Sequence, residues 1–229
     1  MKIQAKKEKF DDRNILQIVM IGRMQGQGIF ITFEGGEGAG KTTLINEMAR
    51  QLEQEGHHVL KTREPGGTRL GEEIRKLLLE HNEPISPYTE LSLFLASRAQ
   101  HVNEVIGPAL LEGKVVLCDR FNDSSVAYQG AARGLGMQQV EEFCHFISQG
   151  VEPRLTFYLD LDPEVGLMRA AKERKQDRIE SETLIFHQKI REAYLSISRA
   201  HPRRFYIISA SLPPAKVFEE AMKRVHAYV

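Results

Sequence analysis

The chain has 229 residues, enough for one compact domain with a substantial core of its own. Lys plus Arg and Asp plus Glu both number 31, so the chain lacks the overall basic charge that binds nucleic acid, and a small-molecule partner is favoured. The two cysteines form no C-x-x-C motif, and no apolar run approaches the roughly 20 residues of a membrane helix. We therefore expect a soluble, cytoplasmic protein without nucleic-acid or membrane partners.

The first 27 residues differ in composition from the rest of the chain. Basic and acidic side chains mix over residues 2–13, a short apolar stretch follows, and a regular pattern begins only at Ile29. We expect residues 1–27 to be a mobile N-terminal extension, or the product of an upstream translation start with Met20 or Met24 as the native one. A membrane or partner anchor would need an amphipathic face, which this segment lacks.

From Ile29 onward, short apolar and β-branched runs alternate with longer stretches of helical periodicity. Strands are predicted at residues 29–34, 59–62, 115–118, 155–161 and 205–209. Helices are predicted at residues 41–54, 69–80, 88–111, 138–148, 163–171 and about 179–199, with a last one after Pro213 and Pro214. Five buried strands separated by helices predict one α/β domain over residues 28–229, doubly wound around a mostly parallel sheet. Ligands of such sheets bind at the carboxyl ends of the strands.

A glycine-rich segment directly follows the first predicted strand and opens a predicted helix. It matches G-x-x-x-x-G-K-[ST], the pattern of a phosphate-binding loop, in the required strand–loop–helix context. Its backbone N–H groups and the helix N-terminus favour an anion, while the lysine can bridge the β- and γ-phosphates of ATP and the threonine can ligate Mg²⁺. A glycine-rich turn that binds nothing is the alternative, which this context disfavours. The predicted ATP-binding residues are Gly35, Gly36, Glu37, Gly38, Ala39, Gly40, Lys41, Thr42 and Thr43.

Asp119 ends the third predicted strand, where a carboxylate would lie beside the phosphate-binding loop. An aspartate at a strand end is often only a helix cap. Because the loop supplies Thr42 as a second oxygen, we predict instead that Asp119 and Thr42 hold Mg²⁺, the aspartate through water.

Arginine-bearing segments distinguish this chain from a GTPase switch, whose guanine-binding N-K-x-D loop is missing from the sequence. Two arginines follow predicted strands, Arg63 in R-E-P-G-G and Arg120 in D-R-F. A solvated helix end would explain the basic segment at residues 169–178 by itself. Taken together, however, the arginines favour phosphoryl transfer to a second phosphate, because two polyanions must be held together. The pattern therefore predicts a nucleoside monophosphate kinase.

Four motifs in this order, F-E-G-G-E-G-A-G-K-T-T, R-E-P-G-G-T, D-R-F-x-x-S and A-Y-Q-G, resemble the bacterial thymidylate kinase family. The resemblance runs from about Ile29 to the C-terminus. It implies a P-loop NTPase-like fold with a mobile lid, Mg²⁺-dependent transfer of the γ-phosphoryl group of ATP to dTMP, and a homodimer. The implied dTMP-binding residues are Glu37, Arg63, Phe94, Arg98, Arg120, Ser124, Ser125 and Tyr128.

The resemblance also implies a role for each of these residues. Two arginines, Arg63 and Arg120, would grip the acceptor phosphate. On one face of the long third helix, Phe94 would stack on thymine and Arg98 would hydrogen-bond its O4. Core packing would explain Phe94 alone, but a core arginine four residues later would be unusual.

The remaining implied contacts surround the thymine edge and the sugar. The Ser124–Ser125 pair would lie near the thymine edge. Tyr128 would crowd the 2′ position and favour deoxyribose, and the Glu37 carboxylate would meet the 3′-hydroxyl.

A lid over residues 169–178 is implied because the loop carries Gly38 where some family members place a catalytic arginine. Family members with glycine there supply arginines from the lid. The alignment puts either Glu173 or Arg174 at the catalytic position; we expect Arg174, with Arg178 in support. The predicted catalytic residues are thus Lys41, Arg120, Arg174 and Arg178.

Two other functions remain open from the sequence. A kinase for another nucleoside monophosphate would share the phosphate chemistry but lack the combination of Phe94, Arg98 and Tyr128. A P-loop regulator that binds ATP without an acceptor would hydrolyse ATP slowly and show no stimulation by any monophosphate.

Overall fold

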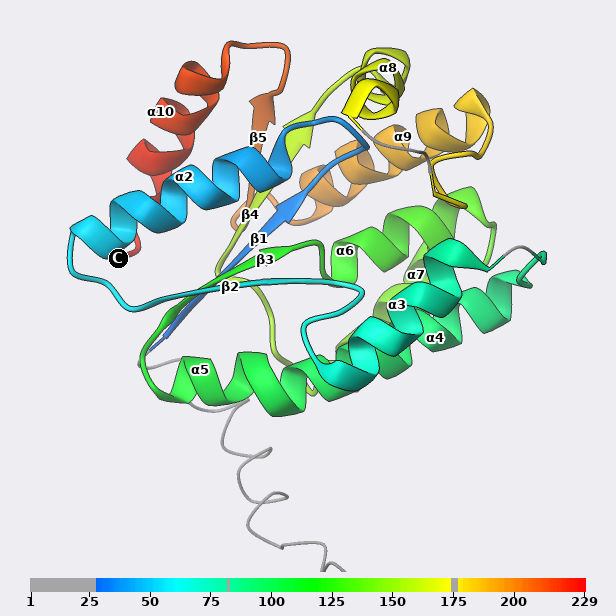
Figure 1. Cartoon of the computed structure of the whole chain (residues 1–229), viewed down its shortest axis with the longest axis horizontal. Coiled ribbons are helices and arrows are strands. Elements are labelled where there is room, and N and C mark those ends of the chain that lie inside the picture. The colour runs from blue at the N-terminus through cyan, green and yellow to red at the C-terminus, as the bar shows by residue number, and fades with distance from the viewer. Residues whose placement is uncertain (1–27, 82, 174–176) are drawn as a thin grey trace, which may run out of the picture.

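Five parallel strands form the centre of the computed structural model, which describes residues 28–81, 83–173 and 177–229 (Figure 1). The strands are β1 (Ile29–Glu34), β2 (Val59–Arg63), β3 (Val115–Asp119), β4 (Leu155–Asp160) and β5 (Phe205–Ser209). They are ordered β2-β3-β1-β4-β5, and each neighbouring pair is parallel. The predicted doubly wound α/β fold is confirmed. The predicted N-terminal extension and Arg174 lie outside the described residues.

Helices cover both faces of this sheet. The described helical segments are α2 (Lys41–Gln54), α3 (Arg69–Glu80), α4 (Pro87–His101), η1 (Val102–Ile106), α5 (Gly107–Leu111), α6 (Asn122–Ser125), η2 (Val126–Ala132), α7 (Met137–Ile147), α8 (Pro163–Glu173), α9 (Leu184–Ala200) and α10 (Pro214–Val225). One face is covered by α2 and α10, which pack on each other and on the strands. The other is covered by α5, α9 and the helices packed around them (Figure 1).

Alternation along β1 decides which side chains reach which face. Ile31 and Phe33 are fully buried in the core under α2 and α10. Thr32 and Glu34 are equally buried but lie on the opposite face, where the Thr32 hydroxyl is 2.9 Å from that of Thr156. A polar side chain on this face of a buried strand needs a hydrogen-bond partner, and that requirement shapes the site below.

Two helices differ from the sequence prediction. The helix expected from residue 179 begins at Leu184, because the Thr183 side chain caps it by accepting the N–H of Phe186, and the Asp177 side chain closes a separate turn before it. The helix through α6 and η2 was not predicted, because its serines, alanines and glycine leave no apolar periodicity to detect.

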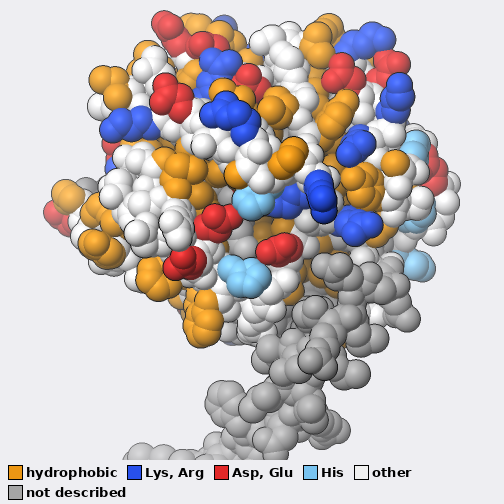
Figure 2. Space-filling view, turned by 180° about the vertical axis from the view of Figure 1, so that it is seen from behind, with side chains coloured by type: hydrophobic (Ala, Val, Ile, Leu, Met, Phe, Trp, Pro, Cys, Tyr) orange, Lys and Arg blue, Asp and Glu red, His pale blue; other side chains and the backbone are white. Residues whose placement is uncertain are grey.

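Basic and acidic side chains are interspersed over the back of the molecule rather than gathered into one field (Figure 2). This distribution accords with the equal totals of the two charges in the chain. In the part of the chain that the structure describes, none of the helices is long and apolar enough to cross a bilayer.

Candidate active site

The phosphate-binding loop joins the end of β1 to the start of α2. Gly40 stands at the helix N-terminus with φ 87°, a conformation open to glycine at little cost. The Lys41 ammonium turns back over the loop and donates to the carbonyls of Gly35 (3.2 Å) and Gly36 (2.9 Å). Burial, with Arg120 nearby, lowers the pKa of Lys41. A buried cation and a helix N-terminus together form an anion site.

Position 38 of the loop has no room for a side chain. Gly38 has φ 63°, and a Cβ atom there would overlap the carbonyl oxygen of Gly166 in α8. The loop and α8 therefore pack backbone against backbone. An arginine at this position would require α8 to move, which fits the expectation that catalytic arginines come from elsewhere.

Two oxygen ligands lie side by side at the start of α2. The Thr42 hydroxyl donates to Oδ2 of Asp119 over 3.3 Å. The sheet register explains this contact, because Asp119 at the end of β3 pairs with Phe33 just before the loop. A hydroxyl and a carboxylate are hard oxygen ligands of the kind that suits Mg²⁺, so these residues fit the metal.

A cavity of about 1060 Å³ connects the phosphate-binding loop with the predicted acceptor residues. Ligand pockets usually have volumes of about 300–1,000 Å³, so this cavity lies at the large end of that range. Loop residues 37–43 and Asp119 line it, and Asp119 contacts Thr42 of the loop. The predicted acceptor residues that line it are Arg63, Phe94, Arg120, Ser124, Ser125 and Tyr128. Within the described chain, Gly35 and Gly36 do not line this cavity, and their carbonyls accept hydrogen bonds from Lys41.

Glu37, Arg120 and Tyr128 form a cluster in the wall of the cavity. Nη2 of Arg120 donates to Oε1 of Glu37 over 2.6 Å, and the Tyr128 hydroxyl donates to the same oxygen over 3.2 Å. The Arg120 guanidinium also lies 5.0 Å from the centroid of the Tyr128 ring. Burial opposes ionisation of Glu37, but Arg120 and Lys41 outweigh it and lower its pKa to about 2. Glu37 is therefore an anion throughout the physiological range.

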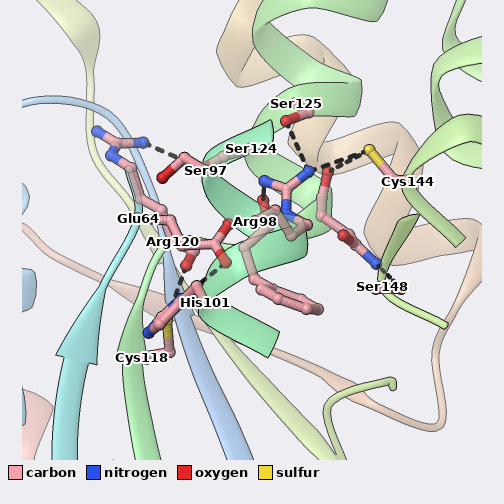
Figure 3. Close-up of polar contacts among 12 residues, drawn as sticks. Glu64, Ser97, Arg98, His101, Cys118, Arg120, Ser124, Ser125, Cys144 and Ser148 are labelled. Carbon is pink, nitrogen blue, oxygen red and sulfur yellow. Dashed lines mark hydrogen bonds and ion pairs between the residues drawn. The ribbon is translucent and has the colours of Figure 1, made fainter. Parts of the chain in front are cut away.

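Arg98 is held differently from the other predicted acceptor residues (Figure 3). Its side chain is 1% exposed, and among the described residues it is not part of the cavity wall. Nε donates to Glu64 over 2.7 Å. The two terminal nitrogens reach Ser125, Cys144 and the carbonyl of Phe121. The structure thus places Arg98 directly behind Ser125, which does line the cavity.

Sequence reasoning missed two buried carboxylates beside this site. The Glu64 carboxylate accepts a hydrogen bond from Arg98, and its Oε1 is 2.9 Å from Nδ1 of His101. The Glu34 carboxylate accepts hydrogen bonds from the hydroxyls of Ser124 and Tyr194. Each had a signal in the sequence, because Glu34 ends an otherwise apolar strand and Glu64 belongs to R-E-P-G-G. A carboxylate is rarely buried unless it is paired.

The lid segment is described at both of its ends. Arg169, in α8, donates to the carbonyl of Ala210 over 3.1 Å. Arg178 donates to the Leu78 carbonyl (2.8 Å) and to Glu90 of α4 (2.6 Å), and in the described part of the chain it does not line the cavity. In this structure Arg178 is therefore held by Glu90 and the end of α3, at the C-terminal end of the segment predicted to be a lid. Arg174 lies outside the described residues.

Comparison with known proteins places this geometry in context. The family model described as "Thymidylate kinase" matches residues 33–221. A thymidylate kinase of Protochlamydia amoebophila is 50% identical over 206 residues, covering 86% of this chain and 92% of its own, and one of Bacillus pumilus is 47% identical, covering 86% and 94%. The crystal structure of thymidylate kinase from Ehrlichia chaffeensis matches with a TM-score of 0.72 at 31% identity, over 87% of this chain and 99% of its own.

Proposed function

The chain belongs to the thymidylate kinase family and phosphorylates dTMP to dTDP with ATP as donor, and we propose that the 1060 Å³ cavity is where the transfer takes place. One observation carries this proposal: a single cavity is lined by the phosphate-binding loop and by the arginine-bearing segments after β2 and β3. A donor bound at the loop and an acceptor bound at those arginines would share this cavity. We further propose that residues 28–229 form the catalytic domain.

On the donor side, the loop backbone and Lys41 bind the phosphates of ATP. The lysine now bonded to two loop carbonyls would exchange those partners for phosphate oxygens. We assign Mg²⁺ to Thr42 and Asp119, on the strength of their adjacent oxygens. The ion, when bound, neutralises charge on the β- and γ-phosphates.

On the acceptor side, Arg63 and Arg120 bind the phosphate of dTMP. Phe94 in the cavity wall stacks on thymine, and Ser125, which accepts from Arg98 behind it, lies along the thymine edge. Ser124 stands near that edge as well, bonded to the Glu34 carboxylate.

The sugar is read by Tyr128 and Glu37, whose side chains touch each other. Tyr128 leaves no room for a hydroxyl at the 2′ position, and the Glu37 carboxylate accepts a hydrogen bond from the 3′-hydroxyl. The low pKa of Glu37 supports this role, since a carboxylate accepts from a hydroxyl more strongly than a neutral acid does.

The reaction is an in-line attack by a phosphate oxygen of dTMP on the γ-phosphorus of ATP, with ADP as leaving group. The acceptor phosphate is already ionised at neutral pH, so a general base is not required. Lys41 and Arg120 hold the two phosphates in line and compensate the charge that spreads over the transferred group. We assign the remaining compensating charge to Arg174 of the lid, with Arg178 holding the base of the lid through Glu90.

Two further proposals concern the molecule in its setting. We propose a homodimer formed through α3 and α7, which both pack on α4 and expose apolar side chains. We also propose that the enzyme works in the cytoplasm, because its two buried cysteines are free thiols and suit a reducing compartment.

The test is ADP release coupled to a spectrophotometric readout, with Mg·ATP and a panel of dTMP, dUMP, UMP, CMP, AMP and GMP. Strong turnover with dTMP and weak turnover with the others is expected. Preference for another monophosphate would retain the phosphate chemistry and overturn the acceptor assignments. Slow ATP hydrolysis that no monophosphate stimulates would contradict the proposed kinase activity itself.

A further inference from the structure

Arg120 occupies a backbone conformation that its surroundings must maintain. Its φ is 70°, and among the described non-glycine residues only Gln149 shares a positive φ. Such a conformation is unfavourable for a residue with a side chain and persists only where neighbouring contacts determine it. The N–H of Arg120 donates to the Phe33 carbonyl over 3.0 Å, which fixes one side of the residue. The other side is fixed by a side chain.

That side chain is Glu34, fully buried at the end of β1. Its Oε1 accepts the backbone N–H of Phe121, the residue after Arg120, over 2.8 Å. Its Oε2 accepts from the Ser124 hydroxyl at 2.6 Å. One carboxylate therefore holds both the peptide that follows Arg120 and the first turn of α6, on which Arg120 depends for its direction.

Tyr194 of α9 is the third residue of this arrangement and is 160 residues from Glu34 in the sequence. Its hydroxyl donates to Oε2 of Glu34 over 2.8 Å and is 2.9 Å from the Ser124 hydroxyl. Nη1 of Arg120 donates to the same tyrosine oxygen over 3.5 Å, so this oxygen touches the guanidinium as well. The Tyr194 ring stacks on Tyr158 with centroids 4.9 Å apart, which sets the direction of the hydroxyl.

We infer that Glu34 and Tyr194 are positioning residues that hold Arg120 in its strained conformation and aim its guanidinium at the acceptor phosphate. The inference rests on the proposed role of Arg120 in binding dTMP. Neither residue lines the cavity in the described chain, so both act through Arg120 rather than on the substrate. Their effect should therefore fall on the acceptor and spare ATP.

The experiment compares Tyr194→Phe, Glu34→Gln and the full-length wild type. Tyr194→Phe keeps the stacked ring and removes only the hydroxyl. Glu34→Gln replaces one carboxylate oxygen, which accepts hydrogen bonds, by an NH₂ group, which donates them. We expect kcat/KM for dTMP to fall about 10-fold in Tyr194→Phe and about 100-fold in Glu34→Gln, with KM for ATP within about 2-fold of wild type. Tyr158→Phe is the matched control, because its hydroxyl in the same stacked pair donates to Asp160 instead.

A mutant cycle with Arg120 separates positioning from general support of the fold. If Tyr194 acts through Arg120, Tyr194→Phe should have no further effect on kcat/KM in an Arg120→Ala background. Additive losses, or equal losses for dTMP and ATP together with a lowered Tm, would overturn the inference. So would wild-type kinetics in Tyr194→Phe, which keeps the test decisive if Glu34→Gln does not fold. An inactive wild type would instead contradict the proposed function.

Discussion

Two arginines proposed for the same substrate differ sharply in what surrounds them. Arg98 and its partner Glu64 are 1% and 3% exposed, whereas Arg63 and its partner Glu72 are 54% and 42% exposed. A buried ion pair gains little over apolar packing, but losing one partner leaves the other charge buried and uncompensated. An exposed pair is screened by water and contributes little. Arg98 is therefore part of the structure that supports the site, whereas the exposed Arg63 can exchange Glu72 for a ligand at little cost.

Substitution of each arginine by methionine tests this difference. Arg98→Met should lower the free energy of unfolding by about 3–5 kcal/mol, because the buried Glu64 side chain keeps only His101 as a side-chain partner among the contacts described. Arg63→Met should lower it by less than about 1 kcal/mol while still raising KM for dTMP. Urea unfolding and steady-state kinetics on the same preparations measure both quantities. Equal losses of stability in the two variants would contradict the burial argument.

At the scale of elements, the segment proposed as a lid contains two basic residues to which we assign different tasks. Arg178 is anchored between α3 and α4 by its hydrogen bond to Glu90. Glu90 also accepts two hydrogen bonds from Arg133, each over 3.1 Å, one at each carboxylate oxygen. This contact ties the segment before α9 to the helices that bear the acceptor pocket. Arg174, four residues earlier in the chain, has the role that we propose in the transition state.

The lid variants should separate these tasks. Arg174→Ala should lower kcat by about 100-fold with little change in KM for dTMP or in Tm, because it removes charge stabilisation specific to the transition state. Arg178→Ala should lower Tm by several degrees, since Glu90 loses one of its two guanidinium partners. Lys175→Ala, a neighbouring basic residue without an assigned role, is the control for lid charge. Wild-type turnover in Arg174→Ala would remove that residue from the mechanism.

Local sequence signals predicted elements better than they predicted contacts. Helix α2 was predicted at its observed bounds because a glycine-rich loop opens it and an apolar stripe runs through it. Helices α6 and η2 were missed because they have no such apolar stripe. The chemistry of the loop followed from residue types alone, as did the placing of Asp119 beside it. The Glu34–Tyr194 contact could not be predicted, because it joins residues 160 apart and depends on how α9 crosses the sheet.

At the scale of the whole molecule, one buried carboxyl couples folding to pH. Burial, followed by the nearby Asp123, raises the pKa of Glu34 from 4.5 to about 7. Ser124, Arg120 and Tyr194 face the carboxyl and lower its pKa only in part. Between these two pKa values the folded protein keeps a proton on Glu34 that the unfolded chain has lost. Stability from this group is therefore greatest at low pH and decreases as pH rises toward 7.

Glu34→Gln should remove this dependence. The free energy of unfolding of the wild type should fall relative to that of the variant by up to about 3 kcal/mol between pH 5 and pH 8. Denaturant unfolding of both proteins at several pH values measures the difference between their free energies of unfolding. Groups that titrate alike in the two proteins do not contribute to this difference. A constant difference across this range would show that Glu34 titrates near its ordinary value.

Assembly is the last property that the surface allows us to predict. Leu70 and Leu77 of α3 are 47% and 54% exposed, and Phe143 and Phe146 of α7 are 55% and 78% exposed. Their spacing places each pair on one face of its helix. Large apolar side chains gathered on neighbouring helices are typical of a protein interface.

If this surface joins two copies of the chain, Phe146→Asp should bury a charge at the interface and raise the dimer Kd by at least about 30-fold. Analytical ultracentrifugation over a concentration series should then detect monomer where the wild type is dimeric. Met168→Asp is the matched control, because Met168 is also 55% exposed but lies on α8, outside the proposed interface. A dimer that Phe146→Asp leaves intact would mean that the subunits meet elsewhere. The exposed apolar side chains of α3 and α7 would then need another partner.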